Sequence, residues 1–141
     1  MIDGGLSGHF KTYLPHFDWQ RVENAAVGRG MPDMNACFAG VEFWIENKTT
    51  EGWKVDLRPE QSAWAARRGR AGGRVFFAVR RLCKAGPRRI AADELYLFHG
   101  NQGQELILGN LKTVKPLGIW TGRPAAWDWT AIQAVLIGPK I

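Results

Sequence analysis

The sequence has few of the residues that support disulfides or metal–sulfur sites. It contains two cysteines, Cys37 and Cys83, and no CxxC pair. This scarcity argues against a zinc ribbon and against a disulfide scaffold. Two isolated cysteines in apolar surroundings are typical of reduced core residues in a cytosolic protein.

Several other signatures are missing as well. No run approaches the roughly 18 apolar residues that a membrane-spanning helix needs, and the N-terminus lacks the apolar segment of a signal peptide. There is no GxxxxGK[ST] motif, no nucleophile elbow, and no HxxxH or HxH spacing among the three histidines. We therefore expect a soluble cytoplasmic protein with no membrane partner, and nothing supports a P-loop NTPase or a serine hydrolase.

What the sequence does contain fits one compact domain over residues 1–141. The hydrophobic fraction is 45%, and neither a linker nor an internal repeat divides the chain. The net charge of +6 favours an anionic partner, most often nucleic acid. Seven tryptophans are many for this length and indicate either a large aromatic core or surfaces that stack on bases.

The residue pattern predicts a mixed α/β sheet with helices packed against it. We expect helices at 7–14, from Pro59 to near Gly69 or Gly72-Gly73, and at 128–137, with Asp128 as a cap. We expect strands at 34–39, 41–49, 74–80 and 94–98. Residues 17–24 fit a strand or a helical turn, 84–89 a basic turn, and 104–111 a helix or a strand.

The strands at 34–39 and 41–49 are expected to form a hairpin that turns at Gly40. Asp33 lies seven positions before Gly40 and Glu46 six positions after it, so the hairpin places the two carboxylates nearly opposite. Facing carboxylates repel each other unless a cation sits between them, and Mg²⁺ suits such hard oxygen ligands. Lys48 is two positions beyond Glu46 and therefore points to the same side of the strand.

A plainer interpretation exists for each of these residues. Asp33 can simply cap a turn after Pro32, and Glu46 and Lys48 can be the solvent face of an edge strand, with Glu42 as one more charge on it. Taken together with the flanking apolar residues and the helix that starts at Pro59, the three residues favour a catalytic site.

Three short motifs in this order resemble the PD-(D/E)XK nuclease superfamily. They are Gly30-Met31-Pro32-Asp33, Ile45-Glu46-Asn47-Lys48 and Leu57-Arg58-Pro59-Glu60-Gln61. Within the superfamily the chain is most similar to small phage and archaeal Holliday-junction-resolvase-like nucleases and to VRR-NUC domains. The resemblance covers residues 20–80 well and the remainder weakly.

This resemblance implies a restriction-endonuclease-like fold and a role for each matching residue. Asp33 and Glu46 would bind Mg²⁺, for which Mn²⁺ can substitute, and the carbonyl of Asn47 would complete the metal shell. Lys48 would be the catalytic lysine, and Gln61 would match the glutamine on the helix after the catalytic hairpin. The family usually adds an acidic residue from its first helix, for which Glu23 is the best match.

The function that the resemblance implies is metal-dependent hydrolysis of DNA. The expected substrate is branched DNA such as a Holliday junction, cut by a homodimer, in a bacterial or phage-infected cell during DNA recombination. Two alternatives remain open: a nuclease of the same fold of restriction, homing or flap type, and a non-catalytic DNA-binding module.

A run of basic residues in the middle third is a candidate DNA-contacting surface. Its members are Arg67, Arg68, Arg70, Arg74, Arg80, Arg81, Lys84, Arg88 and Arg89. The sequence does not indicate which of them contact DNA. Three later tryptophans, Trp120, Trp127 and Trp129, favour core or interface packing over base stacking.

Overall fold

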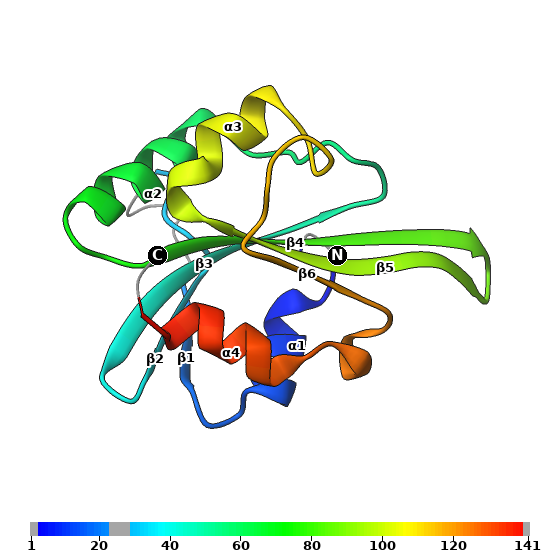
Figure 1. Ribbon diagram of the computed structural model, residues 1–141, viewed down its shortest axis with the longest axis horizontal. Helices are drawn as coiled ribbons and strands as arrows, with labels where there is room; N and C mark the ends of the chain where they lie inside the picture. The colour runs from blue at the N-terminus through cyan, green and yellow to red at the C-terminus, as the bar shows by residue number, and fades with distance from the viewer. Residues whose placement is uncertain (1–2, 23–28, 140–141) are drawn as a thin grey trace.

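The computed structural model describes residues 3–22 and 29–139 as an α/β protein (Figure 1). Its helices and strands, in chain order, are α1 (Leu6–Tyr13), β1 (Asp18–Arg21), β2 (Met34–Phe38), β3 (Val41–Thr50), α2 (Pro59–Arg70), β4 (Val75–Gly86), β5 (Arg89–His99), α3 (Gly103–Leu108), β6 (Gly118–Thr121) and α4 (Trp129–Ile137). Short 3₁₀ turns lie at Gly100–Gln102 and Pro124–Ala126. No helix of the described ranges is long and apolar enough to cross a membrane.

The strands form a six-stranded mixed sheet whose order follows the chain, from β1 to β6. Among the strand pairs of the described residues, only β3 and β4 are parallel, and every other neighbouring pair is antiparallel. Helix α2 makes the crossover between the two parallel strands, since parallel neighbours cannot be joined by a tight turn. This arrangement confirms the predicted α/β class with helices flanking a mixed sheet.

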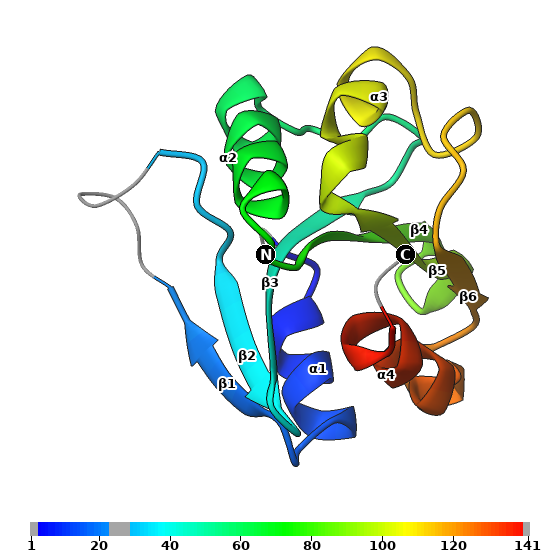
Figure 2. The ribbon, with the colours of Figure 1, turned by 60° about the vertical axis from the view of Figure 1, so that its left-hand side comes forward.

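Helices cover both faces of the sheet (Figure 2). Helices α1 and α4 pack on one face, where Phe10 and Ile132 are fully buried against strand residues such as Phe43. Helices α2 and α3 pack on the other face, where Trp64 and Leu106 meet Phe77 and its neighbours. Residues 75–79 of β4 and 95–98 of β5 are buried, which explains why these two segments read as continuous apolar runs.

The predicted hairpin is present with a two-residue turn. Phe38 pairs with Val41, so Ala39 and Gly40 form the turn, and both have positive φ (52° and 80°). Positive φ at both central residues is the requirement of a type I′ turn, whose twist matches that of the strands. The turn therefore fixes the register of β2 against β3.

The structure differs from the expectation at two places. Strand β6 was not predicted. Its four residues are extended because they pair with β5, and their sequence shows no alternating pattern of its own that indicates a strand. The expected basic turn at residues 84–89 is wrong in extent: β4 continues to Gly86 and β5 begins at Arg89. Glycine, proline and exposed charges suggested a long turn there, although the cross-strand pairing continues almost to the tip.

The late tryptophans belong to the core, as the packing interpretation predicted. Trp127 is 3% exposed, and Trp120 and Trp129 pack against the same cluster from its margin. The indole N–H groups of Trp127 and Trp129 donate to the carbonyls of Gly122 and Pro124, at 2.8 Å each. Trp127 is therefore a core residue, and Trp120 and Trp129 are half-buried at the edge of the core.

Candidate active site

Asp33 and Glu46 face each other at the open end of the β2–β3 hairpin. The last paired residues are Met34 and Ile45, so the next pair outward joins Asp33 and Glu46. The peptide N–H of Val22 donates to the carbonyl of Asp33 (2.8 Å), which fixes the backbone there. Residues directly opposite in an antiparallel pair place their side chains on the same face.

Burial sets the electrostatics of this pair. It raises the pKa of Asp33 to about 6, against a hydrogen bond from the Asn47 N–H that lowers it. It also raises the pKa of Glu46 to about 7, and the neighbouring Asp33 carboxylate adds to that rise. Both carboxylates therefore resist ionisation. A cation bound between them would favour their charged forms and reverse this rise in pKa.

Lys48 supplies the positive charge nearest to Glu46. Its ammonium nitrogen lies 3.7 Å from Glu46 Oε2, and its side chain is 15% exposed. Lys48 lowers the pKa of Glu46, but burial and Asp33 outweigh it. The structure therefore brings together the three residues that the sequence grouped: Asp33, Glu46 and Lys48.

Asn47 contributes its backbone to this site and its side chain to the opposite face. Its N–H donates to Asp33 Oδ1 (3.3 Å), whereas its side-chain Nδ2 donates to the sulfur of Met34 (3.0 Å). In an antiparallel strand the N–H and C=O of one residue face the same neighbour. The carbonyl of Asn47 therefore faces the side on which Asp33 lies, as the predicted role as a metal ligand requires.

Gln61 lies in the first turn of α2, where it caps the helix. Its Oε1 accepts a hydrogen bond from the N–H of Arg58 (3.0 Å). No hydrogen bond joins Gln61 to Lys48 in the part of the chain that the structure describes. The predicted catalytic role of Gln61 stays a prediction, and its observed contact is structural.

Gly30 explains how the loop before Asp33 approaches the start of α2. It has a φ of 82°, and a Cβ placed there would lie 2.0 Å from the carbonyl oxygen of Glu60. Only glycine permits this approach. The sequence motifs that begin at Gly30 and end at Gln61 are therefore in direct contact.

Asp3 is a carboxylate that the sequence reasoning missed. It precedes α1 and accepts hydrogen bonds from the N–H groups of Gly5 (2.9 Å) and Ser7 (3.2 Å). Its charge contributes to the raised pKa of Asp33, so the two carboxylates lie near each other. The signal available in the sequence was an aspartate four residues before Ser7, a local capping pattern rather than a catalytic motif. Glu23, the acid expected from the sequence, lies outside the described residues.

The donor set fits a divalent cation of the Mg²⁺ type. Among residues 3–22 and 29–139 there is no group of three or more His, Cys, Asp or Glu side chains that could hold a metal ion. The site instead offers two carboxylates and a backbone carbonyl, all hard oxygen donors. Mg²⁺ commonly binds through one or two carboxylates and keeps several waters.

The basic residues of the middle third separate into two groups. Arg80 is 5% exposed and makes two hydrogen bonds with Asp93, and Arg81 pairs with Glu94 (2.9 Å). Arg68 lies over the rings of Trp44 and Trp64, and Arg74 donates to the carbonyl of Leu136. The others, Arg67, Arg70, Lys84, Arg88 and Arg89, are exposed and have no ion pair or side-chain hydrogen bond within the described ranges.

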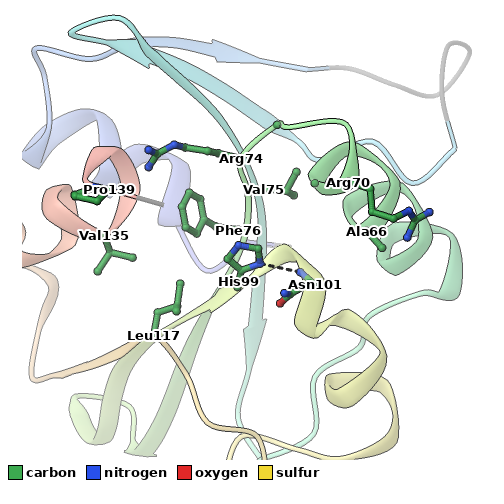
Figure 3. A pocket seen from close by; sticks show the side chains of 12 residues that line it. Ala66, Arg70, Arg74, Val75, Phe76, His99, Asn101, Leu117, Val135 and Pro139 are labelled. Carbon is green, nitrogen blue, oxygen red and sulfur yellow. Dashed lines mark hydrogen bonds between the residues drawn. The ribbon is translucent and has the colours of Figure 1, made fainter. Parts of the chain in front are cut away.

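A hollow of about 480 Å³ is lined by residues of α2, of the start of β4 and of the C-terminal part of α4 (Figure 3). Phe76, His99 and Asn101 line it, and Arg70 and Arg74 stand at its margin. Neither carboxylate of the hairpin belongs to it. No protein-family model and no curated protein matches the chain.

Proposed function

We propose that the protein is a metal-dependent endonuclease of the restriction-endonuclease-like fold that hydrolyses phosphodiester bonds in DNA. The observation that carries the proposal is the grouping of Asp33, Glu46 and Lys48 on one face at the open end of the hairpin. Two carboxylates held in a buried setting and a lysine beside them are a recurrent arrangement for phosphoryl transfer on a metal. The exposed basic residues supply a surface for the DNA backbone.

Asp33, Glu46 and the carbonyl of Asn47 are the residues that would hold the cation. When bound, Mg²⁺ supplies positive charge against the oxygens of the scissile phosphate. The hydrogen bond from the Asn47 N–H holds the Asp33 carboxylate in place before any ligand arrives. Preorganisation of this kind avoids a reorganisation cost during the reaction.

Lys48 would act on the phosphate or on the water that attacks it. Its ammonium group has three donors on a flexible stem, so it can orient a water and neutralise charge that develops on the phosphate oxygens. The oxygen of the attacking water forms a new bond to phosphorus and releases a proton to solvent, and the P–O3′ bond breaks. The products carry a 5′-phosphate and a 3′-hydroxyl, and the leaving oxygen takes a proton from solvent.

The test of catalysis is cleavage by purified wild type and by Asp33→Asn, Glu46→Gln and Lys48→Gln variants in Mg²⁺. Each change nearly preserves side-chain size, and we expect each to reduce cleavage at least about 100-fold. The matched control is Glu42→Gln, an exposed carboxylate on β3 outside the pair, which should cleave as wild type does. If Asp33→Asn and Glu46→Gln retain full cleavage, the assigned mechanism is wrong.

The substrate is proposed to be branched DNA, cut by a homodimer whose symmetry pairs two sites. A four-way junction, a flap and a linear duplex of the same sequence would be compared under one condition, and light scattering would report the oligomer. Preference for the junction by a dimer supports resolvase activity. Equal cleavage of the linear duplex would instead favour a restriction-type or other nuclease of this fold.

A further inference from the structure

The β4–β5 ribbon extends well beyond the rest of the molecule (Figure 1). Strand β3 pairs with β4 only as far as Thr50 opposite Arg81, and β6 pairs with β5 only from Glu94 onward. Beyond those rows, residues 82–92 form two strands and a tip with no third strand beside them in the described structure. We call residues 82–92 the arm.

The arm is basic and contains no acid. Its charged side chains are Lys84, Arg88 and Arg89, and all three are exposed. The remaining residues are small or apolar, and Ile90 is 37% exposed. A projecting segment with three positive charges and no negative one has the charge expected of a surface that meets phosphates.

The base of the arm is anchored, which gives the arm a defined direction. The Arg81 guanidinium lies 3.8 Å from the centre of the Trp53 ring and pairs with Glu94 across the strands. Arg80 is held on the opposite face by Asp93, at 2.7 Å. The thiol of Cys83 donates to the carbonyl of Glu51 (2.7 Å). These contacts use Arg80 and Arg81 internally, whereas Lys84, Arg88 and Arg89 form no ion pair with the residues that the structure describes.

The arm extends away from the candidate active site in the direction in which the parallel strands β3 and β4 run. Lys48 is level with Val79 of β4, and the tip at Pro87 lies eight residues further on. At about 3.3 Å per residue this is roughly 26 Å, or about seven to eight base pairs of duplex. A twisted two-stranded ribbon is also about the width that the major groove admits.

We propose that the arm is a second DNA-binding element that grips duplex DNA about seven to eight base pairs from the scissile phosphate. This inference rests on the proposed function for the position of the scissile phosphate, but the binding itself does not need catalysis. A long ribbon with unpaired edges is of marginal stability alone, so binding to a duplex would also stabilise it. Register shifts near Lys84 twist this part of the ribbon relative to its base.

The test is the salt dependence of binding to a fluorescent linear duplex of about 30 base pairs, measured by anisotropy with Ca²⁺ in place of Mg²⁺. The Arg88→Gln/Arg89→Gln variant removes two arm charges. We expect its slope of log K against log salt to fall in magnitude by about 1.8, and its Kd at low salt to rise by at least about tenfold. The matched control is Lys11→Gln/Lys115→Gln, which removes two exposed charges outside the arm and should change the slope by much less.

Each outcome decides the proposal. An unchanged slope for the arm variant, equal losses in both variants, or no binding of duplex by wild type would overturn it. If the arm variant changes oligomeric state without changing DNA affinity, the arm is instead a contact between copies of the chain. If wild type binds DNA through the arm but cleaves none, the proposed catalysis is refuted, whereas the proposed DNA binding by the arm is supported.

Discussion

The ammonium group of Lys48 lies 3.7 Å from the carboxylate of Glu46, yet the pKa of Glu46 is raised to about 7. A nearby lysine normally lowers the pKa of a carboxyl group. Here burial and the facing Asp33 carboxylate outweigh it. The site is short of positive charge, which is the physical reason to expect a cation in it.

The raised pKa values predict a specific pH dependence of stability without metal. Because the folded pKa of Asp33 (about 6) and of Glu46 (about 7) exceed their ordinary values, both groups favour folding when protonated. Their contribution is complete at low pH and is lost as pH rises from about 4 to about 7. Thermal unfolding in EDTA should show wild type losing stability over this window relative to Asp33→Asn/Glu46→Gln.

Added Mg²⁺ provides the control for that experiment. It should raise the Tm of wild type at pH 8 and leave the double variant unchanged, because only wild type has the paired carboxylates. Parallel pH profiles for the two proteins in EDTA would show that the pKa shifts are absent.

Gly30 and Gly40 allow backbone strain to be separated from a steric clash. Both have φ near 80°, but a Cβ at Gly30 would meet the carbonyl of Glu60, whereas a Cβ at Gly40 meets nothing within 4 Å. Gly40→Ala should cost about 1–2 kcal/mol of unfolding free energy from the left-handed backbone alone. Gly30→Ala should cost more and should also reduce cleavage, since the loop carrying Asp33 must move away from α2.

Chemical denaturation and a cleavage assay on both variants measure these two effects. Equal destabilisation by the two substitutions, with cleavage retained in both, would contradict the role assigned to the contact between Gly30 and Glu60.

Gln61 offers a way to distinguish capping from catalysis. Gln61→Ala removes the acceptor for the Arg58 N–H and should cost about 1 kcal/mol. Gln61→Glu keeps an acceptor oxygen, and it should keep the stability. If Gln61 also contacts substrate, as the family resemblance implies, Gln61→Glu should cleave more slowly despite its normal Tm. Normal cleavage by the Gln61→Glu variant would mean that the role of Gln61 is to cap α2 and not to contact substrate.

Arg80 and Arg81 are adjacent in sequence but should respond very differently to substitution. Arg80 is buried with Asp93, so Arg80→Ala leaves the buried carboxylate with only the exposed Arg123, at 3.5 Å, and should cost about 3 kcal/mol. Arg81 pairs with the partly exposed Glu94 and packs on the Trp53 ring, so Arg81→Ala should cost less, about 1–2 kcal/mol. Urea unfolding of the two variants tests this. Comparable losses would mean that burial does not distinguish the two ion pairs.

Much of the site was predictable because it depends on local rules. Strand alternation places Glu46 and Lys48 on one face, and a two-residue turn at Ala39 and Gly40 fixes which residue faces Glu46. Helix α2 begins at Pro59 as expected, and α4 has Asp128 as its cap, which accepts from the Ala131 N–H. Each of these features is decided within about fifteen neighbouring residues.

The remaining features depend on pairing between segments that are distant in sequence. The ion pair of Arg80 follows from the register of β4 against β5, which places Asp93 opposite Leu82, two residues beyond Arg80 on the same strand face. The placement of Asp3 beside Asp33 follows from the packing of α1 on the sheet. Strand β6 forms because its residues pair with the backbone of β5.

The sequence by itself thus determined the hairpin, the identity of its acidic pair and lysine, and the α/β class, because periodicity and turn chemistry act over short range. Only the tertiary structure decided which arginines are internal, which charges project on the arm, and how strongly Asp33 and Glu46 are desolvated. Those properties depend on which distant strands and helices exclude water from a side chain, and no local pattern encodes that.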